Sequence, residues 1–145
     1  MIERMKMSVI TSSIQLSTRG NADIHDITDQ VRQRVSESGL LNGIVTIFCP
    51  SATSGLTTIE YESGALNDLK RLFDQLAPPE QHYAHNARWG DGNGHSHIRA
   101  ALIKASFTVP FVNGRLTLGT WQQIIHIDFD NRSRQRELVV QVMGE

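Results

Sequence analysis

The stretch FTVPFVNGRLTL, Phe107 to Leu118, sets the architecture of this chain, because it predicts a β-hairpin. Residues 107–112 form an apolar, β-prone run, and residues 115–118 form a second one. The dipeptide Asn113-Gly114 between them readily adopts the positive φ angles of a tight hairpin turn. We therefore expect antiparallel strands in the C-terminal part of the chain.

The flanking sequence extends this pattern into a sheet with helices. The segments Gln122–Phe129 and Arg136–Met143 predict a second hairpin around Asp130-Asn131. Strands are also expected at 7–16, 42–48 and 55–61, and helices at 23–36, 63–77 and, shorter, 97–105. The predicted fold class is α+β: a mixed, largely antiparallel sheet with two main helices and one short helix packed on it. Residues 1–145 are expected to form a single domain.

Composition and charge exclude several classes of protein. The net charge of −1 over 145 residues gives no broad basic face for nucleic acid. The densest basic run, Arg132–Arg136, is interpreted as a solvated hairpin tip. No apolar run approaches the roughly 18 residues that cross a bilayer. A single cysteine, Cys49, and an N-terminus without a signal-peptide core predict a cytoplasmic protein.

The glycine-rich stretch WGDGNGHSH, Trp89 to His97, begins in the last part of a long polar segment at 80–94 and leads into the short helix. His85, His95 and His97 fall within thirteen residues, with Asp91 among them. Imidazole and carboxylate groups are the usual ligands of zinc and related divalent metals. Gly92 and Gly94 permit tight bends that bring backbone N–H groups close to a ligand. Spacing alone leaves two interpretations open, a site or a polar turn with exposed histidines.

Other polar residues carry weaker signals. Ser51–Gly55 is either an anion-binding turn or an ordinary one, and Glu60 is either part of a solvated strand face or a base in a pocket. Trp121 is expected in the core, and Gln122 beside it either contacts a polar ligand or satisfies backbone groups at a sheet edge. His126 is interpreted as a packed or partner-facing strand residue, and Cys49 as a small buried one. On the short helix, Arg99 and Lys104 are expected outward, and Ile98, Ala101 and Leu102 inward.

Three strings together resemble the YjbQ-like family, which is also described as secondary thiamine-phosphate synthase. They are GLTTIEYE at 55–62, GDGNGHSHIRAALI at 90–103 and SFTVPFVNGRLTLGTWQQI at 106–124, and VVQVMGE at 139–145 is similar as well. The resemblance implies an α+β fold and a homotrimer with sites near the subunit interfaces. It also implies a polar pocket that binds a divalent metal, Zn or Mg, or a phosphorylated small molecule.

The resemblance carries over to particular residues of this chain. It implies catalytic roles for Glu60, Asp91 and His97, and metal binding by His85, His95 and His97. It implies ligand binding by a further set of residues: Gly92, Asn93, Gly94, Arg99, Trp121 and Gln122.

Three hypotheses follow. In the first, the chain is a transferase that joins a hydroxymethylpyrimidine diphosphate to a thiazole phosphate and releases pyrophosphate, with Arg99 of a neighbouring subunit assisting. In the second, the same pocket binds a metal or phosphorylated metabolite without catalysis. In the third, the glycine loop only builds the trimer interface.

Overall fold

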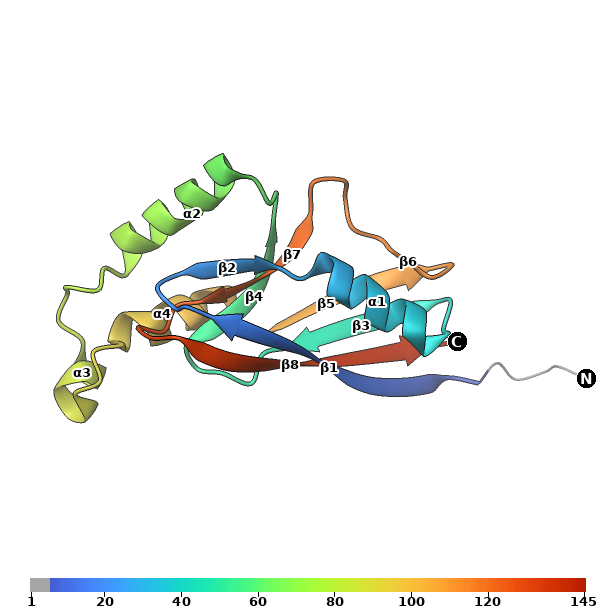
Figure 1. The fold of residues 1–145 in the computed structure, drawn as a ribbon, viewed down its shortest axis with the longest axis horizontal. Helices are drawn as coiled ribbons and strands as arrows, with labels where there is room; N and C mark the ends of the chain where they lie inside the picture. Colours follow the sequence, from blue (N-terminus) through green and yellow to red (C-terminus); the bar gives the residue numbers. More distant parts are fainter. Residues whose placement is uncertain (1–5) are drawn as a thin grey trace, which may run out of the picture.

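The computed structural model describes residues 6–145 and contains two antiparallel sheets flanked by helices (Figure 1). The strands are β1 Ser8–Thr18, β2 Asp23–Asp26, β3 Gly43–Phe48, β4 Ser54–Ile59, β5 Ser106–Val112, β6 Arg115–Leu116, β7 Gln123–Asp128 and β8 Arg134–Gly144. The helices are α1 Thr28–Ser38, α2 Ser63–Leu76, α3 Ala84–Trp89 and α4 Gly94–Ile103. The α+β class expected from the sequence is confirmed.

One sheet has the strand order β1-β8-β3-β5-β6, and the other has the order β2-β7-β4. All recorded strand pairs are antiparallel, and the longest joins β1 to β8 from Ser8↔Gly144 to Thr18↔Arg134. The hairpin predicted at Asn113-Gly114 is present, as β5 and β6. No helix in residues 6–145 is long and apolar enough to cross a membrane.

Two apolar clusters hold the layers together. The larger cluster lies between α1 and the strands and includes Val31, Val35, Val45, Leu138 and Val140. The smaller cluster packs α2 and α4 against the opposite face of the three-stranded sheet, with Phe73 in edge contact with Phe129 at a centroid distance of 4.8 Å. The central strand of the small sheet, β7, is therefore buried along almost its whole length.

The first predicted helix begins later than its periodicity indicated. Residues Asp23–Asp26 form β2 and pair with β7, so the helix begins at Thr28. The carboxylate of Asp26 accepts hydrogen bonds from the Thr28 N–H at 3.0 Å and from the Thr28 hydroxyl at 2.6 Å. Pairing with a neighbouring strand here outweighs the helical spacing of Ile24 and Ile27, because it satisfies backbone groups and buries Ile24 as well.

The second predicted hairpin is wrong, because β7 and β8 belong to different sheets. The connection between them carries buried acids: Asp128 and Asp130 have no exposed surface. Arg136 donates to Asp128 at 2.7 Å, and Arg134 donates to Asp130 at 2.8 Å. The basic run is thus not simply a solvated tip, since two of its arginines neutralise buried carboxylates.

Helix α4 presents the face opposite to the predicted one. Arg99 is buried, whereas Ile98 and Leu102 are about half exposed, at 49% and 57%. The guanidinium of Arg99 donates to the Ala77 carbonyl at 3.0 Å and to Asp74 at 3.1 Å, so it joins α4 to the end of α2. An arginine with such partners is stable inside, and the amphipathic pattern alone does not reveal those partners.

His126 lies at the centre of β7, fully buried, and neither ring nitrogen has a hydrogen-bond partner among the described residues. The expectation that it is a packed residue is confirmed. Burial lowers the pKa of His126 from 6.5 to about 4, because desolvation disfavours the imidazolium; Asp128 opposes the shift only in part.

We expect this imidazole to weaken the fold in acid. Its folded-state pKa lies below the unfolded value, so the unfolded chain binds the proton more readily and stability falls as the pH drops from 6.5 to 4. The contribution is about 3 kcal/mol by pH 4. Denaturant unfolding of wild type and His126→Leu across this range should show that loss in wild type and a shallower pH dependence in the variant.

The matched control is His82→Gln, because His82 is exposed. It should keep the wild-type pH dependence. An identical pH dependence of unfolding in wild type and His126→Leu would contradict the assignment.

Candidate functional site

The candidate site is formed by α3, the first turn of α4 and the glycine loop between them, residues 90–93. Helix α3 ends at Gly90, and Gly90 and Gly92 have φ angles of 73° and 67°, which side chains rarely tolerate. Gly94 serves a different purpose, because a Cβ atom there would come within 2.5 Å of Tyr83. Its N–H donates to the Asn86 side chain at 2.8 Å. The glycines therefore fold the loop tightly back onto α3.

His85 of α3 is brought against two loop oxygens. Its Nε2 atom lies 3.1 Å from Asn93 Oδ1 and 3.2 Å from Asp91 Oδ1. Both neighbouring oxygens are hydrogen-bond acceptors, so Nε2 either bears a proton that it donates to them or binds a metal ion together with them. The predicted metal ligand His85 and the predicted residues Asp91 and Asn93 thus converge on one point.

A hydrogen bond to Asp130 holds Asn93 in this orientation. It is buried, and its Nδ2 atom donates to Asp130 Oδ1 at 3.3 Å, which leaves its Oδ1 atom to face His85. Asp130 also accepts hydrogen bonds from the Asn131 N–H at 2.8 Å and from the Thr53 hydroxyl at 3.2 Å. Burial raises the pKa of Asp130, but the hydrogen bonds from Asn131, Asn93 and Arg134 outweigh it and hold the pKa below 3.8.

His97 completes the cluster from the first turn of α4. Its ring centroid lies 4.2 Å from that of His85. Burial lowers the pKa of His97, and the neighbouring His85 lowers it further against the opposing effect of Asp91 and Asp130. His97 is therefore held as a neutral imidazole near pH 7, available to accept a proton or to bind a cation.

His95 and Arg99 lie apart from this cluster. His95 is buried, with its ring 6.3 Å from that of Tyr83, and its Nδ1 atom has no partner among residues 6–145. Arg99 is occupied by Asp74 and the Ala77 carbonyl. His95 thus lies near Tyr83 and Arg99 contacts the end of α2, whereas His97 lies against His85 of α3.

Glu60, Trp121 and Gln122 lie at the other end of the β4–β7 pair. In the register, Ser54 pairs with Asp128 near the histidine loop, whereas Ile59 pairs with Gln123. Five residue steps along a strand span about 17 Å. Trp121 is 69% exposed, so the expectation that it is a core residue is wrong. Within one chain these residues therefore lie away from His85 and His97.

Sequence reasoning missed the residues that support the site. Asp130 fixes Asn93, Thr53 donates to Asp130, and Asn131 donates from Nδ2 to the Asp91 carbonyl at 2.8 Å. The signal for Asp130 was the alternating IDFD at 127–130, where acids interrupt an apolar strand. Asn86, in contrast, gave no signal, since it acts only through the fold of the loop.

No group of three or more His, Cys, Asp or Glu side chains within residues 6–145 is placed to hold a metal. The set His85, His95 and His97 is not brought together. The donors that do converge are His85 Nε2, Asp91 Oδ1 and the amide oxygen Asn93 Oδ1. Such a mixed nitrogen and oxygen set can bind a divalent cation.

Comparison with known proteins places this chain in a family. The family model described as UPF0047 protein YjbQ-like matches residues 12–145. A UPF0047 protein of Methanothermobacter thermautotrophicus is 37% identical over 139 residues, which cover 96% of this chain and 95% of that protein. The UPF0047 protein YugU of Bacillus subtilis is 34% identical, over 91% of this chain and 98% of that protein.

Solved structures show the same fold. A YbjQ-like protein of unknown function from Sulfolobus solfataricus superposes with a TM-score of 0.92 at 34% identity, covering 97% of this chain and all of that one. A conserved hypothetical protein from Thermus thermophilus superposes with a TM-score of 0.72 at 31% identity, covering 88% and 97% of the two chains. The chain belongs to the UPF0047 family of YjbQ-like proteins.

Proposed function

We propose that this chain is an enzyme that acts on a phosphorylated small molecule at the cluster of His85, Asp91, Asn93 and His97. The observation that carries the proposal is the convergence of Asp91 and Asn93 oxygens on His85 Nε2, at 3.2 and 3.1 Å, beside a neutral His97. A tightly folded glycine-rich loop, a buried amide and a buried carboxylate all fix these few atoms. Such preorganisation is typical of sites that bind or transform a ligand.

The donor set fits a divalent metal, Zn or Mg. Ligands at about 2.0–2.1 Å from a metal lie roughly 3.0–3.3 Å from one another, and the two measured separations fall in this range. Histidine nitrogen favours zinc, and two oxygens are also compatible with magnesium. When bound there, a divalent ion supplies positive charge for phosphate oxygens. His97 stands beside this position, where it can accept a proton or a hydrogen bond from the substrate.

The finer proposal is the transfer reaction that the family resemblance implies. The bond between the pyrimidine methylene carbon and the diphosphate oxygen breaks, pyrophosphate leaves with the electron pair, and a new bond forms from the thiazole nitrogen to that carbon. The site would assist by binding the leaving pyrophosphate, because stabilising a developing anion is the main demand of such chemistry. Binding of a phosphorylated metabolite without catalysis is favoured by one observation, the distance of Glu60 from the histidines within one chain.

A homotrimer would bring Glu60 of one copy close to the histidines of another. Large apolar side chains are exposed over many elements, among them Leu76, Trp89, Leu102 and Trp121, each more than half exposed. Surface of this kind usually marks an interface between copies. In a cyclic trimer a head-to-tail contact brings two different surfaces together. We therefore propose that Glu60, Trp121 and Gln122 of one copy approach the histidine cluster of the next.

The metal part of the proposal is tested by calorimetric titration of the purified, chelator-treated protein with Zn²⁺ and with Mg²⁺. We expect binding by wild type and at least a ten-fold weaker affinity in His85→Ala and Asp91→Ala, because each loses a ligand atom. His82→Ala is the control, since His82 is exposed and outside the cluster. Equal affinities in all four proteins would contradict the assignment.

The shared site is tested by mixing two inactive variants, Glu60→Ala and His97→Ala. Each alone is expected to lose thiamine phosphate formation. Random mixing in a cyclic trimer places an intact glutamate next to an intact histidine at about a quarter of the interfaces. Coexpressed chains should therefore regain about a quarter of wild-type turnover, as measured by product formation.

Three results would redirect the proposal. A monomeric mass by light scattering would overturn the trimer, and no recovery on mixing would remove Glu60 from a shared site. No product from wild type, with metal still bound, would favour binding without catalysis. The control Glu137→Ala changes an exposed glutamate on β8 and should leave turnover unchanged.

A further inference from the structure

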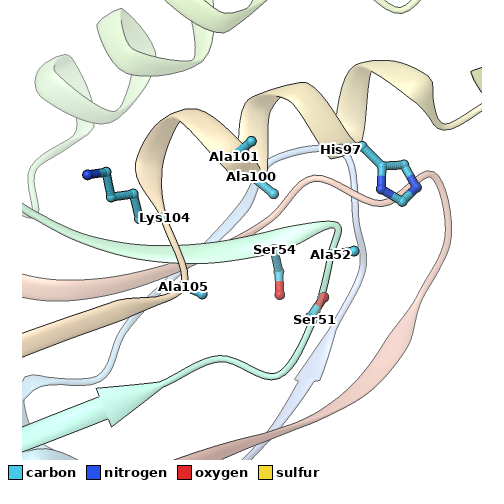
Figure 2. Close-up of a pocket in the computed structure, with 8 residues that line it drawn as sticks. All are labelled: Ser51, Ala52, Ser54, His97, Ala100, Ala101, Lys104 and Ala105. Carbon is cyan, nitrogen blue, oxygen red and sulfur yellow. The ribbon is translucent and has the colours of Figure 1, made fainter. Parts of the chain in front are cut away.

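A groove adjoins the histidine cluster, with α4 as one wall and the loop at 49–53 between β3 and β4 as part of the other (Figure 2). His97 lines the groove from α4, and Ser51 and Ala52 lie across from the helix. Thr53, the last residue of the loop, does not line the groove and is buried. The position of this wall relative to His97 therefore depends on the contacts that hold Thr53 in the interior.

Thr53 is fixed through both its backbone and its side chain. Its carbonyl accepts the Phe129 N–H at 2.9 Å, and its N–H donates to Ser51 Oγ at 3.2 Å. Its hydroxyl oxygen lies 2.9 Å from Arg136 Nη2 and 3.2 Å from Asp130 Oδ2. This one residue therefore joins the loop wall of the groove to the residues that follow β7 and to β8.

The guanidinium of Arg136 sets the direction of these hydrogen bonds. A guanidinium can only donate, so Arg136 Nη2 occupies a lone pair of the Thr53 hydroxyl oxygen. The hydroxyl proton is then directed to Asp130 Oδ2, which accepts it as a carboxylate oxygen. Without Arg136, the Thr53 hydroxyl would lose the contact that fixes its rotation.

Arg136 is itself held in one orientation. Its Nε and Nη2 atoms donate to the two carboxylate oxygens of Asp128, at 2.7 and 3.0 Å, as a fork. Asp128 has no exposed surface, and the side chain of Arg136 is mostly buried. The guanidinium that contacts Thr53 is therefore positioned by the end of β7.

The two oxygens of Asp130 have different partners. Oδ2 accepts hydrogen bonds from Thr53 and Arg134, whereas Oδ1 accepts one from Asn93 Nδ2 at 3.3 Å. An asparagine side chain has one donor end and one acceptor end. Because the donor end of Asn93 is committed to Asp130, its acceptor end, Oδ1, faces His85. The orientation of the Asn93 amide thus depends on an Asp130 carboxylate that does not rotate.

We propose that Arg136 and Thr53 are positioning residues of the candidate site. Thr53 acts through Asp130 on the amide of Asn93, and Arg136 acts by directing the Thr53 hydroxyl. Without that hydroxyl, the carboxylate can rotate and the amide can turn its N–H group toward His85 in place of its oxygen. A donor there would oppose both a cation and a protonated Nε2. The inference rests on the proposed function for the metal, but not for the orientation of Asn93.

The test is Thr53→Val, which removes the hydroxyl and keeps the shape of the side chain. In protein freed of metal with EDTA, we expect the NMR resonances of the Asn93 side-chain N–H group to shift, because its partner is no longer fixed. The Zn²⁺ affinity, measured by calorimetry, should fall about ten-fold, as is typical when a residue that orients metal ligands is lost. Thr53→Ser keeps a hydroxyl and should restore both readouts.

The matched control is Thr18→Val. Thr18 is a second buried threonine of the same network: its hydroxyl donates to Asp128 at 2.6 Å, and within residues 6–145 it has no hydrogen bond to Thr53 or Asp130. Both valine variants should lose a similar amount of stability, seen as a melting temperature lower by about 5 °C. Only Thr53→Val should change the Asn93 resonances and the Zn²⁺ affinity.

Arg136→Lys tests the same inference from the other end, since it keeps a positive charge beside Asp128 and loses the fork that reaches Thr53. It should shift the Asn93 resonances as Thr53→Val does, and it carries the test if Thr53→Val does not fold. Unchanged Asn93 resonances in either variant, or the same shift in Thr18→Val, would overturn the inference. Wild type that binds no metal would sink the metal site, while the Asn93 resonances still decide the positioning role.

Discussion

The buried carboxylate of Asp130 is the interaction on which the site depends. It lies at the junction of the two sheets, where the chain passes from β7 to β8, and it receives hydrogen bonds from Thr53, Asn93 and Arg134. Thr53 lies in the loop between β3 and β4, Asn93 lies in the glycine loop, and Arg134 is the first residue of β8. A single ionised group thus joins three segments that are distant in the sequence. An unpaired charge at this buried position would destabilise the fold, so Asp130 and its three partners are held in place together.

The consequence for the site is an ordered chain of contacts. Asp130 orients the amide of Asn93, and that amide presents its oxygen to His85. Asn131, the next residue after Asp130, holds the carbonyl of Asp91. The histidine cluster therefore sits on a rigid support despite its glycine-rich loop.

The sequence predicted much of this fold, for reasons that can be named. The Asn113-Gly114 hairpin follows from local turn chemistry, and the apolar strand at 43–48 follows from its composition. The pairing of β7 with β2 and β4 does not follow, because it depends on contacts between distant segments. Arg99 was misplaced for a similar reason, since only the nearby Asp74 and Ala77 make a buried guanidinium stable. At the site, clustering predicted that His85 and His97 lie close together, whereas no pattern predicted that Asn93 bridges them to Asp130.

The position of β8 has a consequence for how the chain folds. This strand follows all the others in the sequence, yet it lies between β1 and β3 in the larger sheet. Its eleven-residue ladder with β1 pairs residues 8–18 with residues 134–144, more than a hundred residues later in the sequence. Pairings between such distant segments form slowly, because a long loop must close before they gain contacts. During synthesis, the backbone groups of β1 and β3 that pair with β8 therefore have no strand partner until β8 has been made.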